Sequence, residues 1–305
     1  MKKNKTYLLA VIFILLVVVA YFLNRERKET TYKLDEKILT VDSAAVDKLE
    51  IEYRGKKITL AKSGIEWKIT EPINYNAYQQ FIASALSDLK KYKVVSKVSD
   101  NPDNKDRFGF NDTNVTKVTI YQSGNLLGSI LVGNSANGPG QSYIKKADGK
   151  EIFLADDFLR SNFFKSDLNE WRDKLIVAIT KGAIKTVEFI SSGENYKVDR
   201  DTSANYVCGK DSVKSTDFDG VLNIISNLNT QTFKDSTLGE NVKFDYTIKV
   251  TADKLYEINF LKSSGETPNM KYFLKVSGVN QLFEVDENFL KSLFKTKKDL
   301  IVPKK

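Results

Sequence analysis

The side chains that most often carry acid–base and nucleophilic chemistry are nearly absent from this chain. Its 305 residues include no histidine and one cysteine, Cys208. Ser-His-Asp and Cys-His nucleophiles and histidine-containing zinc sites are therefore excluded. Cys208 stands in a short strand-like run, residues 204–209, so we interpret it as a small buried apolar side chain and not as a reactive thiol.

Two pairs of adjacent acids are the remaining candidates for catalysis. Asp156-Asp157 and Asp286-Glu287 offer the carboxyl groups that glycoside hydrolysis requires on either side of one bond. Each pair precedes a short predicted helix, the first of which runs through Phe164. At such a position a carboxylate satisfies unbonded amides and the helix dipole. We therefore predict that Asp156 and Asp286 cap helices and that the chain has no catalytic residues.

Two polar loops partly match ligand-binding motifs. Gly133 and Gly138 have the spacing of a Walker loop, but Pro139 and Gly140 stand where lysine and serine or threonine must follow. Residues 100–106 resemble a calcium loop but reach neither the glycine nor the distal glutamate that such a loop needs. We interpret both as connecting segments and predict neither a cofactor nor a metal.

Three residues form a predicted interaction surface. Trp171 lies in the charged segment that ends the first half of the chain, whereas Trp67 alternates with charged neighbours and is predicted to face a core. Asn137 and Tyr143 belong to the glycine-rich loop and the strand after it. Exposed loop groups of this kind are suited to contact with a partner or a sugar.

An unbroken apolar run extends from Tyr7 to Leu23. As a helix rising about 1.5 Å per residue, it reaches roughly 25 Å, close to the ~30 Å hydrocarbon core of a bilayer. The run predicts a membrane anchor formed by Tyr7, Leu8, Leu9, Ile12, Phe13, Leu15, Leu16, Val19, Tyr21, Phe22 and Leu23.

A cleaved signal peptide is the alternative interpretation of this run. The run is longer than a usual signal core and no pair of small residues closes it, which favours a retained anchor. Basic residues flank both ends, so charge alone does not set the orientation. Long C-terminal domains translocate largely regardless of charge. We therefore predict a single-pass protein of the cell membrane whose body lies outside the cytoplasm.

The net charge of +8 is concentrated beside the apolar run. Residues 1–28 hold six basic residues and one Glu, which accounts for +5 and leaves +3 for residues 29–305. Lipid headgroups explain the basic flanks, and a body of mixed charge is not typical of a nucleic-acid-binding protein. The predicted partners are therefore the lipid bilayer and an integral membrane protein, with no nucleic acid.

From residue 46 onward the pattern is that of short alternating strands separated by turn signals. A long amphipathic helix is predicted from Tyr75 to Tyr92, and Asp148-Gly149 predicts a two-residue hairpin turn. We predict an α+β fold of two tandem repeated units, each a mainly antiparallel sheet with one long and one short helix, after a transmembrane helix. The predicted domains are residues 1–28 (basic tail and anchor), 29–45 (linker), 46–177 (first unit) and 184–302 (second unit).

The repeat is predicted because the two halves share their order of elements. The apolar face of the second helix follows that of the first by 139 positions, so that Val221, Ile224, Ile225 and Leu228 correspond to Ile82, Ala85, Leu86 and Leu89. The ends also correspond, with residues 297–302 matching residues 172–177.

Several motifs occur in a recognisable order: Trp67-Lys68-Ile69-x-x-Pro72, the helix after it, Phe108-Gly109-Phe110, Gly133, Tyr143 and Trp171-Arg172-Asp173-Lys174. Together they resemble the bacterial family called domain of unknown function 4340, over most of the first unit and more faintly over the second. Members typically carry an N-terminal membrane anchor, and their genes often lie beside ABC transporter components of the gliding-motility type. The resemblance implies an external accessory subunit and supplies no catalytic residues.

Two functions remain open at this point. The favoured hypothesis is a membrane-anchored, non-enzymatic accessory or scaffold subunit outside the cytoplasm, associated with an ABC transporter complex. The alternative is an envelope-anchored protein that binds carbohydrate or processes the cell wall. That alternative requires convergent carboxylates or a row of aromatic side chains in one cleft.

Overall fold

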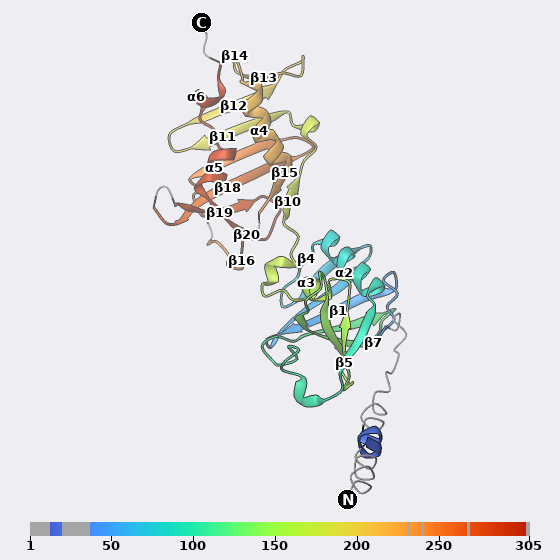
Figure 1. Ribbon diagram of the computed structural model, residues 1–305. Helices are drawn as coiled ribbons and strands as arrows, with labels where there is room; N and C mark the ends of the chain where they lie inside the picture. Colours follow the sequence, from blue (N-terminus) through green and yellow to red (C-terminus); the bar gives the residue numbers. More distant parts are fainter. Residues whose placement is uncertain (1–12, 20–36, 231, 240, 267–268, 303–305) are drawn as a thin grey trace, which may run out of the picture. The chain divides into compact units, whose positions relative to one another are not determined.

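The computed structural model describes residues 13–19, 37–230, 232–239, 241–266 and 269–302 (Figure 1). Residues 13–19 are helical, while the rest of the predicted anchor and residues 29–36 of the predicted linker lie outside the described residues. Among the described residues, no helix has both the length and the apolar character needed to cross a membrane.

The chain forms two compact units, each built from segments that are distant in the sequence. Of the described residues, those within 1–56 and 85–164 form the first compact unit, and those within 57–84 and 165–305 form the second. These bounds differ from those of the predicted repeats, and below the first and second unit are these two compact units. The division falls within α2 (Gln79–Lys91).

The first sheet has nine strands in the order β4-β3-β2-β1-β6-β7-β8-β9-β5. The pairings from β1 through β6, β7, β8 and β9 to β5 are antiparallel. The strands are β1 (Val46–Tyr53), β2 (Lys56–Ser63), β3 (Glu66–Glu71), β4 (Tyr75–Asn76), β5 (Val94–Ser99), β6 (Thr116–Gln122), β7 (Asn125–Ser135), β8 (Ser142–Lys146) and β9 (Ile152–Ala155). Short helices η1 (Pro102–Asn104), α3 (Leu159–Phe163) and η2 (Leu168–Glu170) connect or follow them.

The buried face of this sheet follows from its alternating apolar residues. Leu49 of β1 is paired with Ile120 of β6, and Val118 of β6 is paired with Ile130 of β7. All four side chains are 0% exposed. Successive side chains of a strand point to opposite faces, so these positions share one side of the sheet. Burying each side chain of this size stabilises the fold by about 1.5–3 kcal/mol.

The second nine-stranded sheet has the order β14-β13-β12-β11-β17-β18-β19-β20-β16. Its strands are β11 (Thr186–Ser191), β12 (Asn195–Arg200), β13 (Tyr206–Cys208), β14 (Asp211–Ser212), β16 (Phe233–Lys234), β17 (Tyr246–Thr251), β18 (Leu255–Ser264), β19 (Lys271–Val276) and β20 (Leu282–Asp286). A separate pair consists of β10 (Leu175–Ala178) and β15 (Asn227–Asn229), and η3 (Lys181–Ala183) follows β10.

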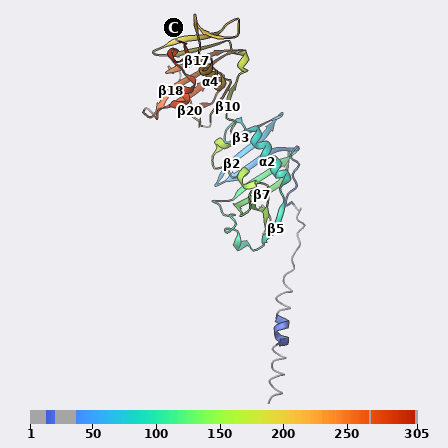
Figure 2. The same ribbon diagram turned by 45° about the horizontal axis from the view of Figure 1, so that its top comes forward.

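Helices α4 (Ser215–Ser226) and α5 (Glu287–Leu293) lie on one face of the second sheet (Figure 1), and α6 (Lys297–Leu300) follows α5. The turned view in Figure 2 shows α4 beside β10, which it contacts. Phe218, Val221, Leu222 and Ile225 of α4 are buried in one apolar cluster with the strands of this sheet. The core is therefore closed by the apolar stripe of the helix.

The two sheets arrange their strands in the same way relative to the chain. In each sheet, the first four strands along the chain run in reverse order to one edge, and the last four follow in order on the other side. The far edge is closed by β5 in the first sheet and by β16 in the second, and each of these strands comes after the long helix of its half. The predicted helix positions are buried in both halves: Ile82, Leu86 and Leu89 are 0%, 6% and 1% exposed, and Val221, Ile225 and Leu228 are 0% exposed.

The structure corrects several sequence-based predictions. The first long helix begins at Gln79 and not at Tyr75, because residues 75–76 form β4 against β3. Asp156 does not cap α3: the cap residue is Phe158, in a left-handed conformation without a side-chain hydrogen bond. Asp286 does cap α5, since its carboxylate accepts a hydrogen bond from the Phe289 amide at 2.7 Å.

Each of the two end segments predicted to correspond contains one residue of an isolated bridge. An isolated bridge joins Ala77, after β4, to Arg172, whereas the bridge after β14 joins Val213 to Ile301. The Asp148-Gly149 turn is present, with the Gly149 amide donating to the Lys146 carbonyl at 3.0 Å, but residues 147–151 separate β8 from β9.

Candidate functional site

The most unusual polar feature in the second unit is a buried arginine. The segment 171–173 extends the edge beyond β4, because the Tyr78 amide donates to the Trp171 carbonyl and the Asp173 amide donates to the Asn76 carbonyl, both at 2.9 Å. Trp171 and Arg172 are both 0% exposed. The turn η2 leads into this segment with a capping box between Asp167 and Glu170.

One carboxylate and two aromatic rings compensate the Arg172 charge. Its Nη2 donates to Oδ2 of Asp235 at 2.8 Å. Its guanidinium carbon lies 4.8 Å from the ring centre of Phe233 and 5.7 Å from that of Tyr75, and the two rings meet edge to face at 5.6 Å. Cation–π contact and a charge-assisted hydrogen bond both favour a guanidinium here.

The hydrogen bonding of Arg172 is incomplete. Its Nε and Nη1 are buried and have no hydrogen-bond partner among the described residues. Each unsatisfied buried donor costs about 1–3 kcal/mol. The side chain of Asp235 is 58% exposed, so one end of the ion pair reaches solvent while the other does not.

Two groups beside Arg172, Asp235 and Tyr75, have shifted pKa values. The hydrogen bond from Arg172 lowers the pKa of Asp235 below its ordinary value, against a smaller effect of burial. Burial, followed by the charge of Asp173, raises the pKa of Tyr75 to about 12. A guanidinium does not release its proton in proteins. Arg172 therefore stays a cation that can bind an anion or hold neighbouring segments in place.

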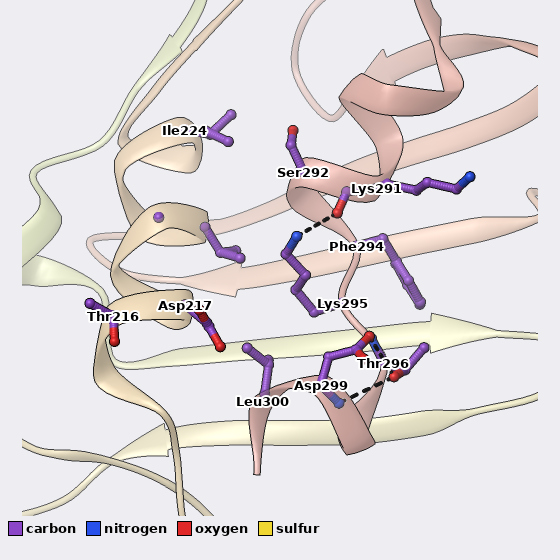
Figure 3. A pocket seen from close by; sticks show the side chains of 12 residues that line it. Thr216, Asp217, Ile224, Lys291, Ser292, Phe294, Lys295, Thr296, Asp299 and Leu300 are labelled. Atoms are coloured by element: carbon purple, nitrogen blue, oxygen red, sulfur yellow. Dashed lines mark hydrogen bonds between the residues drawn. The ribbon is translucent and has the colours of Figure 1, made fainter. Parts of the chain in front are cut away.

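A groove with a volume of about 830 Å³ lies between α4 and the segment formed by α5 and α6 (Figure 3). Val221, Ile224, Phe294 and Leu300 give it apolar walls. Its polar rim is Thr216, Asp217, Lys291, Ser292, Lys295, Thr296 and Asp299.

Much of this rim is already engaged within the chain. Lys295 donates to the Lys291 carbonyl at 2.7 Å, and Lys291 pairs with Glu287 at 2.7 Å. Asp299 accepts from the Thr296 hydroxyl at 2.7 Å and from its amide at 3.1 Å, which lowers the pKa of Asp299. The groove therefore offers hydroxyl, ammonium and apolar contacts.

The family motif around Phe108-Gly109-Phe110 has a packing explanation in the first unit. The Asn134 amide donates to the Phe108 carbonyl at 2.8 Å, and the Phe108 ring meets Tyr143 edge to face at 4.7 Å. A Cβ on Gly133 would lie 2.2 Å from the Phe108 carbonyl oxygen, and one on Gly109 would lie 2.3 Å from the Asn134 side chain. Glycine is needed at both positions because two backbones approach closely.

The three residues of the predicted interaction surface lie in different environments. Trp171 is fully buried and packs edge to face on Phe81, with ring centres 5.1 Å apart. Asn137 is exposed and Tyr143 is half-buried. Their role in an interaction stays a prediction, and the structure places only Asn137 and part of Tyr143 on the surface. Trp67 is 7% exposed, as predicted for a core residue.

Other sequence-based candidates have structural roles. Cys208 ends β13, is 6% exposed, and has its pKa raised by burial, which confirms a buried apolar side chain. Among the described residues, no group of three or more Asp, Glu or Cys side chains could hold a metal ion. The Arg172–Asp235 pair was not predicted, because its partners are 63 residues apart and no local pattern connects them. In the sequence, only the motif Trp171-Arg172-Asp173-Lys174 indicated that Arg172 has a structural role.

These features define an α+β protein of antiparallel sheets whose signature residues serve packing and charge burial. The sequence profile described as Domain of unknown function (DUF4340) matches residues 67–247, more than half of the chain, and the chain belongs to that family. No curated protein matched the chain, and neither did any solved structure.

Proposed function

We propose that this protein is a membrane-anchored accessory subunit whose body, outside the cytoplasm, holds an integral membrane partner. The observation that carries this proposal is the helix of residues 13–19. Its seven consecutive apolar side chains are all exposed, from 67% at Phe13 to 44% at Val19. A helix that is apolar on every side requires an apolar environment, and a bilayer provides one.

We propose further that the body consists of two copies of one unit, residues 46–177 and 184–302. The identical arrangement of strands in the two sheets supports this. A capping box also begins the last helical turn of each copy, with Asp167 and Glu170 in one and Thr296 and Asp299 in the other. Two such sheets supply two contact surfaces from one gene product.

A scaffold role fits the electrostatics better than catalysis does. The carboxyl groups whose pKa values are shifted, Asp100, Asp235, Glu284 and Asp299, all have them lowered. A general acid near neutral pH needs the opposite shift. The family resemblance points to ABC transporter components as the partner, and this identity is part of the proposal.

One observation favours a second candidate, an envelope-anchored protein that binds carbohydrate. The groove between α4 and α5–α6 combines the hydroxyls of Thr216, Ser292 and Thr296 with the ring of Phe294. Hydroxyl groups and an aromatic face are suited to a sugar chain. Binding of wall oligosaccharides to the full-length protein, lost on Phe294→Ala, would favour this candidate.

The test of the accessory function is a pulldown of the tagged full-length protein in mild detergent, followed by mass spectrometry. We expect an integral membrane protein, with ABC transporter subunits enriched, and loss of that partner when Ile14 and Leu16 are replaced by arginine. The proposal fails if no membrane partner is recovered while the full chain hydrolyses wall polymers and a single Asp or Glu substitution abolishes the hydrolysis.

A further inference from the structure

A cavity of about 270 Å³ in the first unit is lined by three lysines. Lys37 comes from the segment before β1, Lys146 is the last residue of β8, and Lys150 lies in the turn between β8 and β9. Ile38, Val94 and Phe153 give the cavity an apolar floor. Its volume is near the lower end for small-ligand sites, which begin at about 300 Å³.

The walls of this cavity are held in place by hydrogen bonds. The Tyr92 hydroxyl accepts from the Leu39 amide at 2.7 Å and donates to the Leu39 carbonyl at 2.8 Å. Lys37 donates to the Lys90 carbonyl at the end of α2. The segment carrying Lys37 and Ile38 is thereby fastened to α2, so the cavity exists before any ligand arrives.

The lining of the cavity holds three ammonium groups and one carboxylate. Lys146 lies 3.8 Å from Asp148, but their side chains are 52% and 77% exposed, and such pairs contribute little. Glu151, the acid in the lining, pairs with Lys97 at 3.2 Å. Exposed Lys90 and Lys91 end α2, and the Lys90 carbonyl accepts the hydrogen bond from Lys37.

We propose that this lysine cavity binds the phosphate of an anionic lipid headgroup at the surface of the membrane that holds the anchor. Ammonium groups are point charges suited to phosphate, and the apolar floor suits the glycerol and upper acyl carbons. The site rests on the proposed anchor: Lys37 follows Leu23 by 14 residues, so the chain between them spans at most about 50 Å. Attraction to anionic lipid acts only within about 8 Å at physiological salt, so the site works in contact with headgroups.

The test uses full-length protein in nanodiscs of phosphatidylcholine alone or mixed with phosphatidylglycerol. Each lysine's rate of acetylation is measured by mass spectrometry. We expect Lys37, Lys146 and Lys150 to react at least about threefold more slowly in the anionic discs, because the headgroup phosphates cover them. The exposed control lysines of the second unit, Lys210, Lys254 and Lys298, should react equally in both.

Matched variants locate the effect. Lys146→Gln/Lys150→Gln should remove the protection of Lys37, whereas Lys210→Gln/Lys254→Gln should leave it intact. Inorganic phosphate added to the phosphatidylcholine discs separates the two sources of phosphate. If it protects the three lysines as strongly as phosphatidylglycerol does, the lipid site is wrong.

The remaining outcomes separate this proposal from the proposed function. A chain that does not insert into discs overturns the anchor, and the lipid site with it. A chain that inserts but shows equal acetylation of the three lysines in both discs overturns the lipid site alone.

Discussion

The guanidinium of Arg172 is completely buried, and the carboxylate that it contacts at 2.8 Å, Asp235, is more than half exposed. The two residues are 63 positions apart, and the pair connects the segment beyond β4 with the end of β16. A buried charge depends on its partner far more than an exposed one does. The pair is therefore a point at which one conservative change should weaken the second unit.

Asp235→Asn should lower the free energy of unfolding by about 1–3 kcal/mol, since a charge-assisted hydrogen bond is lost and the guanidinium remains buried. Chemical denaturation of the full chain in detergent, followed by tryptophan fluorescence, measures this. Asp148→Asn is the control, because that carboxylate is 77% exposed and its pairing is loose. Equal effects of the two variants would contradict a special role for Arg172–Asp235.

The effect of Asp235→Asn should depend on pH. The pKa of Asp235 is lower in the folded protein than its ordinary value of 3.8. Its stabilising contribution is therefore complete above that ordinary value and is lost as pH falls through the lowered folded pKa. Wild type and variant should differ at pH 7 and converge in acid well below pH 3.8. A difference that grows on acidification would reverse the sign.

Leu86→Ala and Ile225→Ala should each cost about 2–5 kcal/mol, because both remove a core side chain at equivalent positions of the two long helices. Leu86 is 6% exposed and Ile225 is 0% exposed. Denaturation curves check this, with Leu126→Ala as the control at a residue 62% exposed. A loss of stability in only one of the two helix variants would argue against equivalent cores.

Ile14→Arg/Leu16→Arg should release the protein from alkali-washed membranes. Each arginine at the centre of a span costs roughly 2.5–3.5 kcal/mol. Ile65→Arg provides the control. Ile65 is 92% exposed and lies in the turn between β2 and β3, outside the predicted anchor. The anchor would be refuted by wild-type protein that alkali extracts completely.

Two glycines should respond to alanine with opposite signs. Gly133→Ala places a Cβ against the Phe108 carbonyl and should destabilise by about 1–3 kcal/mol through overpacking. Gly220 lies within α4 with open space around it, so Gly220→Ala should stabilise by up to about 1 kcal/mol. Thermal unfolding of both variants tests this pair. Tolerance of Ala at position 133 would mean that the loop 108–110 is displaced easily.

The sequence alone determined the parts of this protein that depend on local periodicity. Alternation in residues 49–53 predicted a half-buried strand, and the spacing of Ile82, Leu86 and Leu89 predicted one buried helical face. The burial of Cys208 was predicted correctly for the same reason, because the alternation in a strand indicates which side chains face the core. The resemblance to the family also rested on short motifs, each of which is local in the sequence.

The tertiary structure decided what depends on contacts between distant segments. Trp171 and Arg172 stand in a charged segment, yet the strand-like pairing with residues 76–78 buries both. Asp156 precedes a helix, but the left-handed turn at Asp157 and Phe158 removes it from the cap. The lysine cavity likewise joins Lys37 to Lys150 across more than a hundred residues. Burial and charge pairing at these places arise from the path of the whole chain, which a local pattern does not contain.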